Sequence, residues 1–103
     1  MQIRWTNHAL TQLDEIFYYI AEDSPQNAQH FIDQLIGAAD KIVDFPYSYR
    51  KVPEIKRDDV REVIYKGYRI IFWLANDELI NIMGVESGLP DPLPINHRPW
   101  ETQ

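Results

Sequence analysis

The chain has 103 residues, of which 45% are hydrophobic and 25% charged, and its formal net charge at pH 7 is −6. These values are typical of one globular domain with a single core, so we expect residues 1–103 to form one domain. The acidic total argues against general nucleic-acid binding, because a negative surface repels phosphate. The sequence has no cysteine, which excludes disulfides and fits a reducing cytoplasm, and no apolar run is long enough to span a membrane.

A short strand and two helices are predicted first along the chain. Residues 2–5 favour a strand, and Thr6 after them is a good helix N-cap. Apolar side chains then recur at helical spacing in two stretches, roughly Asn7–Glu22 and Pro25–Asp44. Two amphipathic helices joined by a tight turn form an antiparallel helical hairpin. No third helix is predicted, so a sheet must cover their apolar stripes.

Three strands and a tail follow a polar loop that contains several aromatic residues. Residues 60–65, 68–75 and 79–86 are rich in β-branched and aromatic side chains, and short turns separate them. We therefore predict a three-stranded antiparallel sheet, with the first strand beside the last strand or beside the one before it. Residues 88–103 contain four prolines and form a proline-rich C-terminal tail. The predicted fold class is α+β.

Basic residues are concentrated in one short window, residues 50–69. This window carries a net charge of +3, whereas residues 1–49 carry −5 and residues 70–103 carry −4. Its seven basic residues are Arg50, Lys51, Lys56, Arg57, Arg61, Lys66 and Arg69. The window could contact phosphate or an acidic partner, or it could be a solvated loop of mixed charge.

No residue pattern indicates a metal or cofactor. The histidines at positions 8, 30 and 97 are far apart, and none belongs to a ligand-spaced pair. The four glycines form no phosphate-binding loop, and no serine lies in a nucleophile-elbow motif. We therefore expect no metal site and no cofactor.

Several stretches, in this order, resemble one family. They are "RWTNHALTQLDEIFYYIAEDSPQNAQHFIDQL", "DFPYSYRKVPEI", "VREV" with "GYRIIFWL", and "INIMGV". Together they resemble the RelE/ParE toxins of bacterial type II toxin–antitoxin systems, which act in the cytoplasm, inhibit growth and stabilise plasmids. The resemblance covers about residues 2–88 and is closer to the ParE branch.

The resemblance implies a partner and two alternative targets. The partner is a cognate antitoxin, a small DNA-binding protein whose disordered C-terminal segment folds on the toxin. ParE-like members inhibit DNA gyrase, which is the activity we expect here. RelE-like members are instead ribosome-dependent mRNA endoribonucleases that use basic side chains on the sheet.

The candidate site residues depend on which branch applies. Arg61 and Arg69 fall where the nuclease branch has a sheet lysine and a phosphate-binding arginine, and Val63 lies nearest the position of its second lysine. If the chain is a ribonuclease, the catalytic candidates are Arg61, Arg69 and Glu86, yet no proton donor is evident. The partner-binding candidates are Arg50, Lys51, Lys56, Arg57, Arg61, Arg69, Arg98 and Trp100, the last two in the tail.

The turn at Lys66-Gly67 decides whether the two arginines can act together. A two-residue turn pairs Ile64 with Arg69 and places Arg61 and Arg69 on opposite faces of the sheet. A three-residue turn places both on one face, as a cationic site requires. The plain structural alternative is that Arg69 pairs with Glu62 or another acid while Arg61 is exposed.

Overall fold

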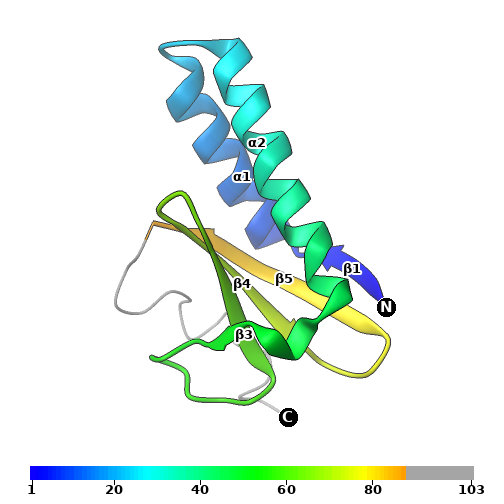
Figure 1. Cartoon of the computed structure of the whole chain (residues 1–103). Helices are drawn as coiled ribbons and strands as arrows, with labels where there is room; N and C mark the ends of the chain where they lie inside the picture. The colour runs from blue at the N-terminus through cyan, green and yellow to red at the C-terminus, as the bar shows by residue number, and fades with distance from the viewer. Residues whose placement is uncertain (88–103) are drawn as a thin grey trace.

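The structure is a computed structural model, and it describes residues 1–87. The predicted tail, residues 88–103, lies outside the described residues. The elements, in chain order, are β1 (Gln2–Trp5), α1 (Asn7–Ala21), α2 (Pro25–Asp40), η1 (Lys41–Asp44), η2 (Pro46–Ser48), β2 (Arg50–Lys51), β3 (Val60–Tyr65), β4 (Tyr68–Leu74) and β5 (Leu79–Glu86). Figure 1 shows the helical hairpin above one face of the sheet, with its connected end extending beyond the sheet.

The sheet has five strands in the order β1-β5-β4-β3-β2. Strands β3, β4 and β5 form the predicted antiparallel meander, and β1 lies beside the last strand, one of the two predicted positions. The prediction of a three-stranded antiparallel sheet was nevertheless incomplete. β1 pairs in parallel with β5, and β2 adds a two-residue edge strand within the segment predicted as loop, so the sheet is mixed.

Local capping explains where the two helices begin. The Thr6 hydroxyl accepts a hydrogen bond from the Ala9 amide at 3.1 Å and donates one to the Ile82 carbonyl at 2.9 Å. Ser24 caps α2 through the Asn27 amide, and Pro25 occupies the first turn, as the sequence predicts. The second helix ends at Asp40 rather than at Asp44, because the chain tightens into the 3₁₀ turn η1 before Pro46.

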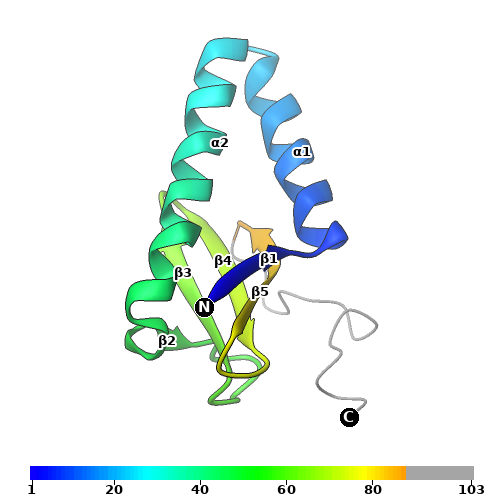
Figure 2. The same ribbon diagram turned by 90° about the vertical axis from the view of Figure 1, so that its right-hand side faces the viewer.

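Two apolar clusters lie on the two faces of the sheet. The larger one fills the space between the helices and the sheet, with Leu13, Leu35, Ile70 and Phe72 among its buried members. The smaller one lies on the opposite face and comprises Val52, Val60, Ile71 and Met83, with Ile55 and Trp73 packed against it. The chain between β2 and β3 therefore covers the face of the sheet that the helices leave open (Figure 2).

The β3–β4 turn has two residues. Lys66 and Gly67 both have positive φ, 46° and 86°, as a type I′ hairpin turn requires, and Tyr65 pairs with Tyr68. Arg69 pairs with Ile64, whereas Arg61 pairs with Phe72. Because side chains alternate along a strand, Arg61 lies on the helix-covered face and Arg69 on the other. A cationic site that joins the two arginines on one face is therefore not formed.

Candidate functional site

The β2–β3 loop, residues 52–59, holds an acidic side chain over the open face of the sheet. Val52 and Ile55 anchor the loop in the smaller apolar cluster. The amides of Ile55 and Lys56 both donate to the Val52 carbonyl, at 3.1 and 3.0 Å, and Lys56 completes the turn at a φ of 57°. This tight turn places the Glu54 carboxylate within reach of Arg69 on β4.

Arg69 is at the centre of a buried ion-pair network. Its Nη1 and Nη2 donate to the two Glu54 oxygens at 2.5 and 2.9 Å, and its Nε donates to Glu62 Oε1 at 2.7 Å. Glu62 is only 1% exposed and also accepts from Arg50 Nε. The hydrogen bonds that Arg69 donates to Glu54, and then the one to Glu62, raise the pKa of Arg69, and the Arg69 guanidinium lowers the pKa of Glu54. Both groups are therefore held in their charged forms.

Arg61 has a structural role on the other face. Its guanidinium donates to the backbone carbonyls of Asp58, Tyr47 and Tyr49 at 2.9, 3.0 and 2.8 Å. It also lies over the Tyr47 ring, 5.1 Å from the ring centroid. Its side chain is 13% exposed, so the expectation that Arg61 is simply exposed was wrong. The companion expectation, that Arg69 pairs with Glu62, is confirmed.

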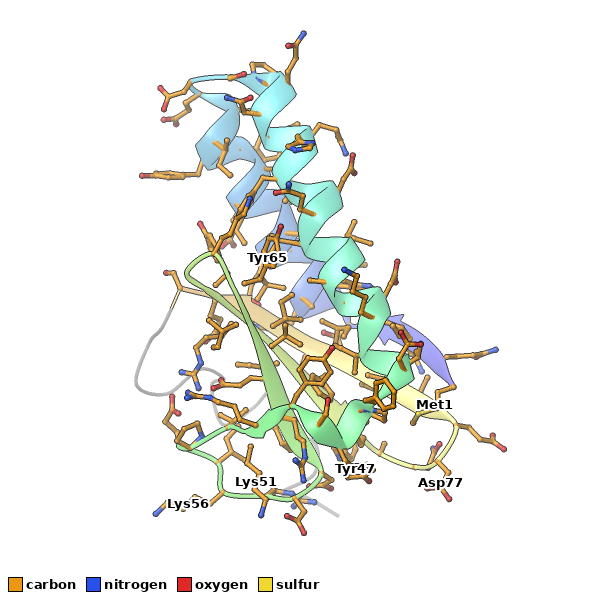
Figure 3. The ribbon with its side chains drawn as sticks, viewed as in Figure 1. Met1, Tyr47, Lys51, Lys56, Tyr65 and Asp77 are labelled. Atoms are coloured by element: carbon orange, nitrogen blue, oxygen red, sulfur yellow. The ribbon has the colours of Figure 1, made fainter. Side chains whose placement is uncertain are left out.

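Most of the basic window is paired within the window. Besides the Arg69 network, Lys51 contacts Asp58 at 2.5 Å, and Arg57 contacts Asp59 at 2.7 Å. The Arg57 hydrogen bond is the main reason why the pKa of Asp59 lies below its ordinary value. Among residues 1–87, Lys56 and Lys66 are the members of the window without an ion pair. Figure 3 shows Lys51 and Lys56 pointing away from the body of the molecule.

Glu86, at the end of β5, is one of two buried carboxylates among residues 1–87, the other being Glu62. It is directly opposite Arg69 in the β4–β5 register, but the hydrogen bond to it comes from helix α1. Gln12 Nε2 donates to Glu86 Oε1 at 3.1 Å, while Gln12 Oε1 accepts from the Val85 amide at 2.7 Å. Burial raises the pKa of Glu86 above its ordinary value.

The structure thus divides the candidates proposed from sequence into groups. Arg50 and Arg69 meet in one network, Arg61 lies across the sheet, and Arg98 and Trp100 lie outside the described residues. Sequence reasoning missed Glu54 and Gln12, whose roles depend on contacts distant in the chain. No group of three or more potential metal ligands occurs within residues 1–87, and no helix described there is long and apolar enough to cross a membrane.

The strand order, with a helical hairpin on one face, defines a small α+β fold with a mixed five-stranded sheet. A solved structure described as "Chromosomal ParDE TA system from P. aeruginosa" has a similar fold, with a TM-score of 0.71. That match has 17% sequence identity and covers 86% of this chain and 97% of the other.

Two sequence comparisons then identify the family within this fold. The model described as "ParE toxin of type II toxin-antitoxin system, parDE" matches residues 3–91. The protein named "Putative toxin Y4kP" from Sinorhizobium fredii (strain NBRC 101917 / NGR234) is 33% identical over 95 residues, which cover 89% of this chain and 96% of that protein. The chain belongs to the ParE toxin family of type II toxin–antitoxin systems. Membership of this family implies an antitoxin partner.

Proposed function

We propose that this protein is a cytoplasmic toxin that inhibits DNA gyrase and that its cognate antitoxin neutralises it. Family membership supports a toxin, and one observation favours gyrase over the ribosome as the target. The arginines that occupy nuclease-like positions, Arg61 and Arg69, are both bound by other groups of this chain and lie on opposite faces of the sheet.

A metal-free ribonuclease needs cations for the developing phosphorane charge, together with a proton acceptor and a proton donor. Arg69 would have to leave Glu54 or Glu62 to reach a phosphate, and leaving Glu62 would weaken the pairing of a buried carboxylate. Glu86 supplies at most one of the two proton-transfer groups. These features argue against RNA cleavage and in favour of action by binding.

The deciding experiment is a supercoiling assay with purified gyrase and relaxed plasmid, run with the toxin and with the toxin–antitoxin complex. We expect the free toxin to inhibit supercoiling or to trap gyrase-cleaved DNA, and the complex to do neither. A parallel reaction with ribosomes should leave mRNA intact. Ribosome-dependent mRNA cleavage that Arg69→Ala abolishes would refute the gyrase proposal and establish the alternative activity.

The antitoxin part of the proposal makes a separate prediction about the basic window. Acidic antitoxin side chains would pair with its exposed cations, so neutralising Arg50, Lys51, Lys56 and Arg57 together should weaken binding and reduce its salt dependence. Lys56 alone should account for much of the change, because the other three side chains already have acidic partners. Unchanged affinity at all salt concentrations would show that the contact is apolar and lies elsewhere.

A further inference from the structure

A hollow of about 460 Å³ lies between helix α1 and the C-terminal end of β5. Gln12, Glu15 and Tyr19 line it from α1, and Tyr68 and Glu86 line it from the sheet. Its volume lies within the range of small-ligand sites in proteins. Among these lining residues there are two carboxylates and two tyrosines but no basic side chain.

One carboxylate oxygen in this hollow has no hydrogen-bond donor among residues 1–87. Glu86 is 7% exposed, and its Oε1 accepts from Gln12, but its buried Oε2 has no partner in that part of the chain. A buried acceptor without a donor costs free energy, more so when it carries charge. A donor brought by a second molecule would remove that cost.

The surrounding charges also favour a cation. Arg69, directly opposite Glu86 in the β4–β5 register, is the cation that acts on this carboxyl from the sheet. Within residues 1–87, Arg69 donates hydrogen bonds to Glu54 and Glu62, and the Glu86 carboxylate accepts a hydrogen bond from the neutral Gln12 side chain.

The aromatic walls select among possible cations. Tyr19 is 73% exposed on α1, and Tyr68 begins β4 at the other side of the hollow. A guanidinium group stacks on aromatic rings and presents five N–H donors in a plane, so it can contact a tyrosine face and carboxylates together. An ammonium group lacks the planar surface for stacking.

We propose that this hollow is a receptor for an arginine side chain of the antitoxin, bound between Tyr19 and Tyr68 and paired with Glu86 and Glu15. The inference rests on the proposed function for the source of the arginine, the antitoxin, but not on gyrase as the target. The hollow thus adds an acidic site for a basic antitoxin side chain, whereas all but one of the other partner-binding candidates, Trp100, are basic.

The chemistry of the hollow can be tested by NMR titration of the full chain with N-acetyl-arginine-N-methylamide. The corresponding citrulline derivative, which is neutral and of nearly the same shape, is the matched control ligand. We expect saturable shifts at the Val85 and Glu86 amides with a Kd on the order of 1–10 mM, because one side chain buries little area. The citrulline derivative should give no saturable shift.

Two variants assign the effect to Glu86. Glu86→Gln keeps the shape and the bond from Gln12 while removing the charge, and it should weaken the arginine probe about tenfold. Glu22→Gln removes an exposed acid of the same chain that does not line the hollow, and it should bind the probe as the wild type does. Equal binding of the citrulline derivative, or an unchanged Kd in Glu86→Gln, would overturn the proposal.

The protonation state of Glu86 gives a second readout that does not depend on folding stability. Arg69 and Glu54 act on this carboxyl, and Glu15 lines the same hollow. A bound guanidinium should lower the pKa of Glu86, followed through its side-chain carbon signal. An unchanged titration in the presence of saturating probe would contradict the pairing.

The source of the arginine is tested with the purified antitoxin by titration calorimetry. Glu86→Gln should weaken antitoxin binding at least about tenfold, whereas Glu22→Gln should leave it unchanged. Probe binding combined with unchanged antitoxin affinity would overturn the antitoxin as the source. Neither experiment contains gyrase, so failure here is distinct from failure of the supercoiling assay.

Discussion

Arg69→Met tests whether the ion-pair network holds the open face of the sheet together. The substitution keeps a long side chain but removes the charge that joins Glu54 to Glu62. Glu62 has a fully buried side chain and would keep only Arg50, whose own side chain is 61% exposed. Glu54 can regain water, because its side chain is already 26% exposed. The loss should therefore come mainly from Glu62.

The structure sets the expected size of this loss. Breaking a buried ion pair by removing one partner costs about 3–5 kcal/mol, and the remaining Arg50 contact places this case near 3 kcal/mol. For a domain of about 100 residues, each kcal/mol lowers Tm by roughly 4–8 °C. We therefore expect Arg69→Met to unfold roughly 12–24 °C below the wild type in a thermal melt followed by circular dichroism.

Two further variants give the experiment its controls. Lys51→Met removes an exposed ion pair with Asp58 and should leave Tm close to the wild-type value. Adding Glu62→Gln to Arg69→Met removes the stranded charge and should recover much of the lost stability. A loss in Arg69→Met no larger than in Lys51→Met would refute the reasoning. No recovery in the double variant would assign the loss to packing rather than to charge.

Three other predictions follow from features of the fold and can be checked by chemical or thermal unfolding. Gly67→Ala should destabilise the protein by about 1–2 kcal/mol, because φ at this residue is +86°. Gly37→Ala should instead stabilise it by up to about 1 kcal/mol, because a Cβ at this position in α2 meets no other atom and alanine favours a helix. Equal effects at both sites would contradict this reasoning. Thr6→Ala should cost about 1–2 kcal/mol by removing the α1 cap and the bond to β5, and a neutral result would show that water replaces both. Glu54 has a lowered pKa in the folded state, so its ion pair with Arg69 contributes to the free energy of unfolding at pH values above the ordinary 4.5, and this contribution is lost as pH falls through the lower folded value. Glu54→Gln should therefore flatten the fall in stability below pH 4.5. An unchanged slope would assign the acid sensitivity to other carboxylates.

The parts of the fold predicted best are those with a local periodic signal. The stripes of both helices, the caps at Thr6 and Ser24 and the position of the turn at Lys66-Gly67 each depend on residues within a few positions of one another. The sequence left the length of that turn open between two and three residues. The parallel pairing of β1 with β5 has no such signal, because its partners are more than seventy residues apart, for example Gln2 and Leu79. Two-residue strands such as β2 are too short to show alternation at all.

The candidate site was harder to predict for the same reason. The sequence indicated that Arg69 could meet Glu62, because turn geometry fixes a hairpin register. It did not indicate Glu54, whose position depends on how Val52 and Ile55 fold the loop onto the sheet. Gln12 reaches β5 only because α1 crosses that strand in the folded protein. The partner-binding roles of the basic residues remain predictions.

The position of β1 has a consequence for how the chain folds during synthesis. The first strand emerges from the ribosome early, but the edge that receives it is β5, the last strand, and Thr6 at the start of α1 also bonds to β5. Pairings this distant in sequence form late, because the loop they close must be ordered first. A nascent chain interrupted before Leu79 therefore has no completed sheet for either element. Translational arrest before that point should release unfolded, protease-sensitive fragments, because the sheet can close only after β5 has emerged.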